Sequence, residues 1–150
     1  MYKSILVPTD GSKLSAKAVK QAVGFAKTIG AKLTVLHVMP GFHMFASGGF
    51  TPPKSTLAPV KKKYEEEARA ASRKIVDKAC AVAAAAGVEC SGAVANSDSP
   101  YDAIIKQAAK FNCDLIMMAS HGRRGLQSML LGSETQKVLS HSDIPVLILR

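Results

Sequence analysis

The chain has no tryptophan, few aromatic residues, only three cysteines and no long apolar run. Cys80, Cys90 and Cys113 are odd in number and form no CxxC motif, which excludes a disulfide framework and argues against a zinc site. The apolar runs fall far short of the ~20 residues that a membrane-spanning helix needs, and the first residues lack the shape of a secretory signal. We therefore expect a cytoplasmic protein with free thiols and no membrane partner.

Acidic residues are also scarce. The chain has 11 Asp and Glu and 20 Lys and Arg, which gives a formal net charge of +9. The whole excess lies in residues 1–78, whereas residues 79–150 are neutral. Basic surfaces of this kind favour polyanions such as nucleic acids. No aromatic residue is interleaved with Lys13, Lys17 and Lys20, which argues against stacking on single strands. We expect these lysines to form a solvated surface and expect no nucleic-acid partner.

At 150 residues the chain is long enough to form one domain with a substantial core, residues 1–150. Its short apolar runs do not alternate with polar residues, which is typical of strands covered on both faces in a parallel sheet. The predicted strands are Ile5–Val7, Leu33–Val38, a weaker Val88–Val94, Leu115–Met118 and Val146–Leu149.

Helical patterns separate these strands. Apolar residues three and four positions apart predict one helix over Leu14–Ile29 and a second over Tyr64–Ala86. Ser99 as N-cap before a proline predicts the start of a third helix, and Ser133 as N-cap of a capping box predicts a fourth. The alternation predicts an α/β fold, a doubly wound parallel sheet of five strands with about four helices. Between the second strand and the second helix, Met39–Ala58 is predicted to be a long loop, such as a lid.

Polar residues and glycines follow two of the predicted strands. The first strand ends in Pro8-Thr9-Asp10, and the fourth ends in Ala119–Gly122. A strand order of 3-2-1-4-5 makes these two ends neighbours, at the point where ligands bind in open α/β sheets. The loop then reaches Gly132-Ser133 at a helix start, where free backbone N–H groups bind anions, and Arg123 and Arg124 add charge. This pattern predicts a phosphate cradle, although neither GxxxxGK[ST] nor GxGxxG is present.

Several segments resemble the universal stress protein family: the opening ILVPTDGS, the strand LTVLHV, and MASHGRRGLQSMLLGSETQKVL followed by IPVLIL. The nucleotide-binding branch of that family carries G-x2-G-x9-G-[ST]. Gly122 and Gly132-Ser133 keep that spacing here, and Ala119 stands at the first glycine. The resemblance implies a Rossmann-like fold of order 3-2-1-4-5, a homodimer, and binding of ATP or AMP, with Mg²⁺ accompanying ATP.

The resemblance also implies binding residues. Pro8, Thr9 and Asp10 would face the adenosine end, and the Val38 backbone would contact adenine. The ribose and phosphates would lie along a second group: Met118, Ala119, Ser120, His121, Gly122, Arg123, Arg124, Gly132, Ser133 and Glu134. Alanine at position 119 either costs about 1–2 kcal/mol, if the backbone is left-handed there, or only shifts the ribose slightly.

Three functions remain open at this point. The first is a homodimeric nucleotide-binding module in stress signalling, the second a nucleotide-free scaffold dimer, and the third a slow ATP hydrolase. No nucleophile or paired carboxylate accompanies His121 in the local sequence, so we expect no catalytic residue. The predicted dimer forms through residues 144–149, an apolar edge strand that pairs with its copy across a two-fold axis.

Overall fold

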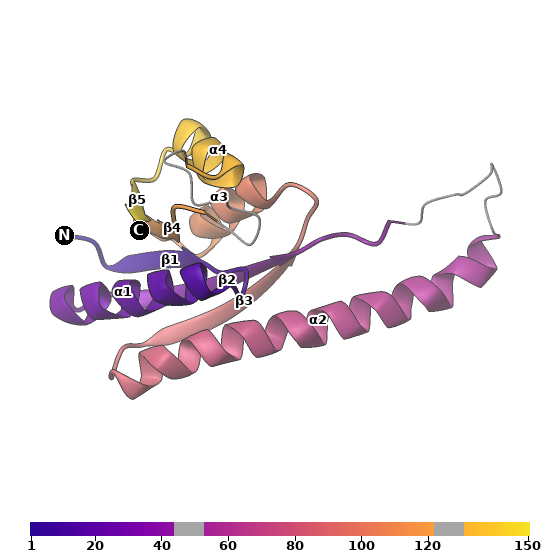
Figure 1. Cartoon of the computed structure of the whole chain (residues 1–150), viewed down its shortest axis with the longest axis horizontal. Coiled ribbons are helices and arrows are strands. Elements are labelled where there is room, and N and C mark those ends of the chain that lie inside the picture. Colours follow the sequence, from indigo (N-terminus) through magenta and orange to yellow (C-terminus); the bar gives the residue numbers. More distant parts are fainter. Residues whose placement is uncertain (44–52, 122–130) are drawn as a thin grey trace.

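The computed structural model describes residues 1–43, 53–121 and 131–150 (Figure 1). In chain order the elements are β1 (Ser4–Pro8), α1 (Lys13–Ile29), β2 (Lys32–Met39), α2 (Lys54–Ala85), β3 (Cys90–Asn96), α3 (Pro100–Lys110), β4 (Leu115–Ala119), α4 (Ser133–His141) and β5 (Val146–Leu149). The five strands are parallel and ordered β3-β2-β1-β4-β5. The predicted fold class and strand order are therefore confirmed.

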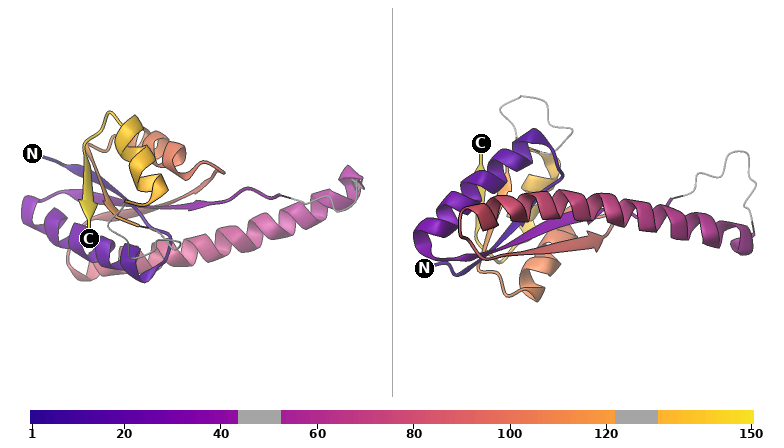
Figure 2. Two further views of the ribbon diagram at one scale, coloured as in Figure 1. Left: turned by 45° about the horizontal axis from the view of Figure 1, so that its top comes forward. Right: turned by 90° about the horizontal axis from the view of Figure 1, so that it is seen from below.

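The sheet is covered on both faces (Figure 2). Ile5 and Val7 of β1 belong to a core cluster with α1 and α2, whereas Leu6 belongs to a second cluster with α3 and α4. All three side chains are fully buried. Successive side chains of a strand point to opposite faces, so two covered faces require apolar residues at every position. This is the physical reason for the unbroken apolar runs in the sequence.

α1 follows its prediction closely. The Ser12 hydroxyl caps it by accepting a hydrogen bond from the Ser15 N–H at 3.2 Å. Gly30 ends it in the left-handed region, with φ of 69°. The chain then turns directly into β2, which pairs with β1 from its first residue.

α2 begins well before its apolar pattern does. The pattern starts at Tyr64, but the helix starts at Lys54. The prediction of a loop over Met39–Ala58 is therefore wrong for residues 54–58, and also for Met39, which is the last residue of β2. Residues 44–52 of that predicted loop lie outside the described part of the chain, and so does any role as a lid. The third strand also differs, since it spans Cys90–Asn96 rather than Val88–Val94.

The first half of α2 projects past the sheet (Figure 1). All the buried residues of this helix lie at or beyond Ser72, so the earlier turns have no core face for a pattern to reveal. Lysine and glutamate four positions apart support these turns, at 3.8 Å in Lys61–Glu65 and at 4.0 Å in Lys62–Glu66 and Lys63–Glu67. Among the described residues, no helix is both long and apolar enough to span a membrane.

Candidate functional site

A cavity of about 620 Å³ opens beyond the carboxyl ends of β1, β2 and β4. We call it the site cavity. It lies where the strand order reverses, because β1 runs between β2 on one side and β4 on the other. Open α/β sheets bind ligands at this position, since the neighbouring connections leave to opposite faces there. Its volume suits a ligand of nucleotide size.

Ten of the predicted binding residues line the site cavity: Pro8, Thr9, Asp10, Val38, Met118, Ala119, His121, Gly132, Ser133 and Glu134. Ser120 is only 5% exposed and lies behind the lining, although its hydroxyl is 3.1 Å from His121 Nδ1. Gly122, Arg123 and Arg124 lie outside the described residues. The fold thus brings the end of β1 together with residues of β4 and α4 that lie more than a hundred positions later in the sequence.

Other lining residues were not predicted: Ser15, Leu36, His37, Pro40, Pro100, Ile104 and Thr135. Leu36 and His37 precede Val38 at the end of β2. Their place near the carboxyl end of a predicted strand is the sequence feature from which they could have been predicted as lining residues. Pro100 and Ile104 come from α3, and no local pattern showed that this helix starts beside α4.

A polar network fixes the end of β1. The Thr9 N–H donates to the Leu36 carbonyl at 2.8 Å, and the Thr9 hydroxyl is 3.0 Å from the Ser15 hydroxyl. Half-buried His37 has Nδ1 2.8 Å from the Thr9 carbonyl, and a carbonyl only accepts, so this nitrogen carries a proton and donates. Asp10 Oδ1 accepts from the Ser12 N–H at 2.9 Å. These contacts hold the β1 end rigidly against β2 and α1.

α4 docks directly on the end of β4. The Gly132 N–H donates to the Ser120 carbonyl at 2.9 Å, and the buried Thr135 hydroxyl is 3.2 Å from the Ala119 carbonyl. A Cβ on Gly132 would lie 3.3 Å from both His121 Cα and the Ser120 carbonyl. A side chain at this position would therefore push against the backbone at the end of β4 by a few tenths of an ångström, and glycine avoids this contact.

The structure corrects the predicted start of α4. Its N-cap is Gly132, and Ser133 is the first helical residue, so the prediction of Ser133 as a capping serine is wrong. The first N–H groups of a helix have no partner within it, and the helix dipole adds positive potential there. Ser133 is exposed and lines the site cavity, so the start of α4 borders this space.

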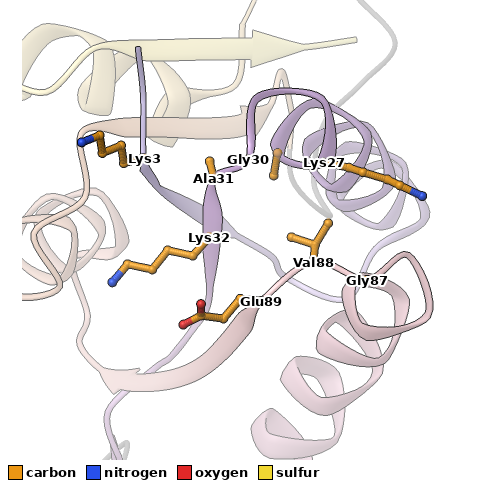
Figure 3. A pocket seen from close by; sticks show the side chains of 9 residues that line it. Lys3, Lys27, Gly30, Ala31, Lys32, Gly87, Val88 and Glu89 are labelled. Carbon is orange, nitrogen blue, oxygen red and sulfur yellow. The ribbon is translucent and has the colours of Figure 1, made fainter.

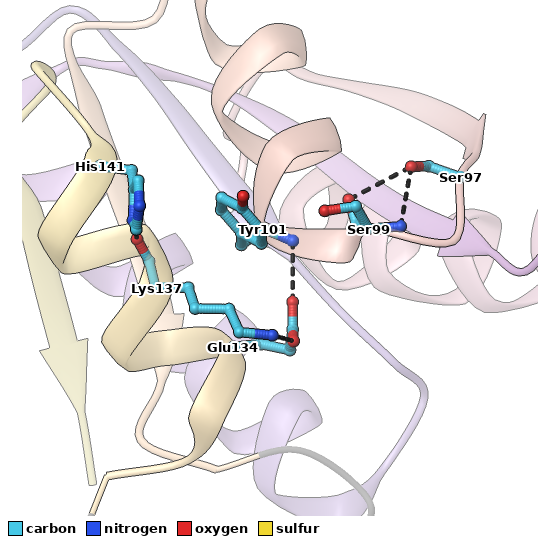
Figure 4. Close-up of polar contacts among 6 residues, drawn as sticks. All are labelled: Ser97, Ser99, Tyr101, Glu134, Lys137 and His141. Atoms are coloured by element: carbon cyan, nitrogen blue, oxygen red, sulfur yellow. Dashed lines mark hydrogen bonds and ion pairs between the residues drawn. The ribbon is translucent and has the colours of Figure 1, made fainter.

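Glu134 joins the starts of α3 and α4 (Figure 4). Its Oε2 accepts a hydrogen bond from the Tyr101 N–H at 2.9 Å, and its Oε1 is 2.9 Å from Lys137 Nζ. Ser99 is the N-cap residue of α3 as predicted, but its side chain makes no capping bond within the described residues. A carboxylate from the first turn of α4 therefore lies at the positive end of α3.

A second hollow, of about 320 Å³, lies at the amino ends of β1 and β2, far from the site cavity (Figure 3). Lys3, Lys27 and Lys32 line it together with Glu89. The amino groups of Lys3 and Lys27 point away from each other rather than into the hollow. These lysines carry part of the basic excess of the first half of the chain, and their arrangement does not converge on a ligand.

Metal-ligating side chains do not gather anywhere in the described ranges, where no group of three or more His, Cys, Asp or Glu could hold a metal ion. The site cavity contains two carboxylates, those of Asp10 and Glu134, and both already accept backbone N–H bonds. A Mg²⁺ ion that arrives with ATP can rest mainly on phosphate oxygens and water, with few protein ligands.

Comparison with known proteins places this architecture in a family. The model of the universal stress protein family matches residues 1–150. Universal stress protein YxiE of Bacillus subtilis is 35% identical over 153 residues, which cover 100% of both chains. The solved structure of hypothetical protein MJ0577 has a TM-score of 0.74 and 26% identity, covering 99% of this chain and 96% of its own.

A further solved structure is of a universal stress protein in complex with cAMP. It has a TM-score of 0.67 and 25% identity, and the match covers 99% of this chain and 97% of that one. The match to the solved MJ0577 structure agrees with the observed fold, and the family model and the full-length relative agree on the family. The chain belongs to the universal stress protein family.

Proposed function

We propose that the site cavity binds an adenine nucleotide, ATP or AMP, and that the protein is a nucleotide-responsive module in stress signalling. The observation that carries this proposal is the exposed start of α4 at Gly132-Ser133, next to the ends of β1 and β4. Backbone N–H groups and a hydroxyl at such a helix start suit a phosphate. The relative solved with cAMP supports an adenine nucleotide as the ligand class.

The site cavity has different chemistry at its two ends. Its β1–β2 end presents Pro8, Val38 and the Thr9 network, which suit an adenine base and a ribose. Its α4 end presents Gly132 and Ser133, which suit phosphate. We propose that the predicted Arg123 and Arg124 add charge-assisted contacts to the same phosphate.

Ala119, the departure from the family motif, fits this proposal. It belongs to β4 and pairs in parallel register with Leu149 of β5, so its backbone is extended. Asn112 is the only non-glycine residue with positive φ in the described part of the chain. Alanine at position 119 therefore carries no left-handed strain, and the first of the two alternatives for this position does not apply.

Binding can be tested directly on the purified protein. We expect an adenine nucleotide to co-purify, and we expect calorimetric titration with ATP and with AMP to show micromolar-class binding. Absence of any heat or chemical shift change at millimolar ligand would contradict the proposal and favour the nucleotide-free scaffold.

Glu134 provides a prediction about phosphate number. Its carboxylate lies beside the proposed phosphate position, so Glu134→Gln removes a repelling charge but keeps an oxygen that can accept from the Tyr101 N–H. We expect affinity for ATP to rise about threefold to tenfold without Mg²⁺, with a smaller change for AMP and none for adenosine. Titrations with the three ligands measure this, and Glu66→Gln on exposed α2 is the matched control. A uniform change across the ligands would count against repulsion by Glu134.

We further propose that the protein is a homodimer through β5, the last strand of the sheet. The carbonyls of Pro145 and Leu149 accept from β4, at Ile116 and Ser120. The N–H and C=O groups of one residue point to the same side of a strand, so those of Val146 and Ile148 point to the open edge. Leu147 is 39% exposed beside this edge. A second copy running antiparallel would pair with both outward residues.

Val146→Pro removes one of these outward donors without touching a β4–β5 hydrogen bond. We expect it to convert the dimer to monomer, because proline cannot donate to the ladder between the two copies. Light scattering measures the mass of each form, and circular dichroism checks that the variant is folded. A wild-type protein with the mass of one chain would refute this interface.

A further inference from the structure

Two of the three cysteines lie side by side, far from the site cavity. Cys80 is on α2 and Cys90 is the first residue of β3, and their sulfur atoms are 2.9 Å apart. Both side chains are half-buried, so small solutes can reach them. Cys90 lies at the amino end of its strand, whereas the site cavity lies beyond the carboxyl ends.

Tight packing between α2 and β3 holds this pair together. A Cβ on Gly92 would lie 2.2 Å from Val76 Cγ1 and 3.5 Å from Cys80 Sγ, so the helix rests directly on the strand backbone. Arg73 of the same helix donates a hydrogen bond to the Gly92 carbonyl at 3.2 Å. A disulfide bond is about 2.05 Å long, so the two sulfurs need to approach by less than about 1 Å to bond.

We propose that Cys80 and Cys90 form an oxidation site that closes into a reversible intramolecular disulfide, with small hydroperoxides as the oxidant class. No third metal-ligating side chain joins them among residues 1–43, 53–121 and 131–150, so the pair fits a dithiol rather than a metal site. The 10-residue separation closes a short loop through the turn at Gly87.

The reaction balances in two steps. The Cys80 sulfur attacks the terminal oxygen of the hydroperoxide, the O–O bond breaks, and the products are a Cys80 sulfenic acid and an alcohol, or water from hydrogen peroxide. The Cys90 sulfur then attacks the Cys80 sulfur, the S–O bond breaks, and water leaves with the Cys90 proton. The two thiols lose two electrons and two protons in total, and the peroxide gains them.

The hydrogen bond between the two cysteines indicates which sulfur is oxidised first. The Cys90 S–H donates to Cys80 Sγ, so Cys80 is the acceptor and the sulfur oxidised first. Burial, with a further contribution from Cys80, raises the pKa of Cys90 to about 12. Since the thiolate is the attacking species, we expect disulfide closure to be slow near neutral pH and to accelerate as the pH rises.

Cys113 provides an internal control. It is 6% exposed, its sulfur accepts from the Ser4 hydroxyl at 3.6 Å, and burial raises the pKa of its thiol. It lies two residues before β4, in the other core cluster, separated by the sheet from Cys80 and Cys90. We expect it to stay reduced under conditions that oxidise the pair.

The experiment treats the purified full chain with hydrogen peroxide and counts thiols after denaturation. We expect the count to fall from three to one, the intact mass to drop by two hydrogens, and a peptide map to show a Cys80–Cys90 link that dithiothreitol reverses. Cys113→Ser should form the link at the wild-type rate, whereas Cys80→Ser and Cys90→Ser should not form it. A mass gain of oxygen without a link, or a disulfide between chains, would overturn the proposal. The outcome does not depend on nucleotide binding.

Discussion

Replacing Ser133 with aspartate is expected to weaken binding of ATP and AMP about 10- to 100-fold while leaving the fold intact. Ser133 is the exposed first residue of α4 and lines the site cavity, so the new carboxylate would lie where the phosphate is proposed to bind. An acidic residue in the first turn of a helix is favourable by about 0.3–1 kcal/mol, so thermal stability should be unchanged or slightly higher.

The measurement is calorimetric titration with each nucleotide, alongside thermal unfolding. Ser55→Asp is the matched control, because Ser55 is also exposed in the first turn of a helix, on α2 and away from the site cavity. Ser133→Ala removes only the hydroxyl and should cost about 0.5–1.5 kcal/mol of binding free energy, as one hydrogen bond. If the aspartate variant binds both nucleotides as tightly as the wild type, phosphate does not lie at the start of α4.

Gly92→Ala is expected to destabilise the protein by about 1–3 kcal/mol or more, although the change adds a single methyl group. The added Cβ would lie 2.2 Å from Cγ1 of fully buried Val76, a distance that no real contact reaches. Valine is branched at Cβ and cannot swing this methyl aside freely. Either α2 must lift off β3 or the strand must shift, and both movements lose buried contact.

Urea unfolding measures this loss, and a second substitution tests its cause. Val76→Ala removes the clashing methyl, so the double variant should be more stable than the sum of the two single effects predicts. Gly24→Ala in α1 is the control, because its new Cβ meets nothing within 4 Å, and it should stabilise by roughly 0.5–1 kcal/mol. Strict additivity between positions 76 and 92 would show that the predicted overlap does not cause the destabilisation.

Where a segment packs against the sheet, its sequence predicts its structure well. The strands were found because two covered faces demand apolar residues at each position, as in Ile5, Leu6 and Val7. The early turns of α2 were missed because they bury nothing, and only their Lys–Glu spacing of four, as in Lys61–Glu65, marks a helix. Burial thus generates the pattern on which such predictions depend.

Capping was harder to predict than the strands because the partners come from distant segments. The sequence pattern predicts Ser133 as the cap of α4, but Gly132 is the N-cap and Ser133 is an exposed residue that lines the site cavity. Ser99 is the N-cap residue of α3 as predicted, but the side chain that accepts from the Tyr101 N–H at this helix start is that of Glu134, 33 positions away. A short motif shows where a helix starts and therefore which backbone N–H groups need an acceptor. The packing of the helices determines which residue provides that acceptor.

For the site cavity too, the sequence predicts some of the lining residues, and others depend on how distant segments pack. The ends of β1 and β4 were predicted as neighbours from a strand order, and they line one cavity. Pro100 and Ile104 could not be predicted, because their contribution depends on how closely α3 approaches α4. Whether the assembled residues bind a nucleotide is the question that the Ser133 and Glu134 variants address.

The projecting half of α2 affects how this protein must be measured in solution. At 1.5 Å per residue, its 32 residues form a rod about 48 Å long, and the turns before Ser72 extend from the sheet (Figure 1). An asymmetric particle experiences more friction than a sphere of equal mass, so a single chain should elute early from a sizing column and imitate a larger species. Scattering mass, rather than elution volume, must therefore decide between one copy and two.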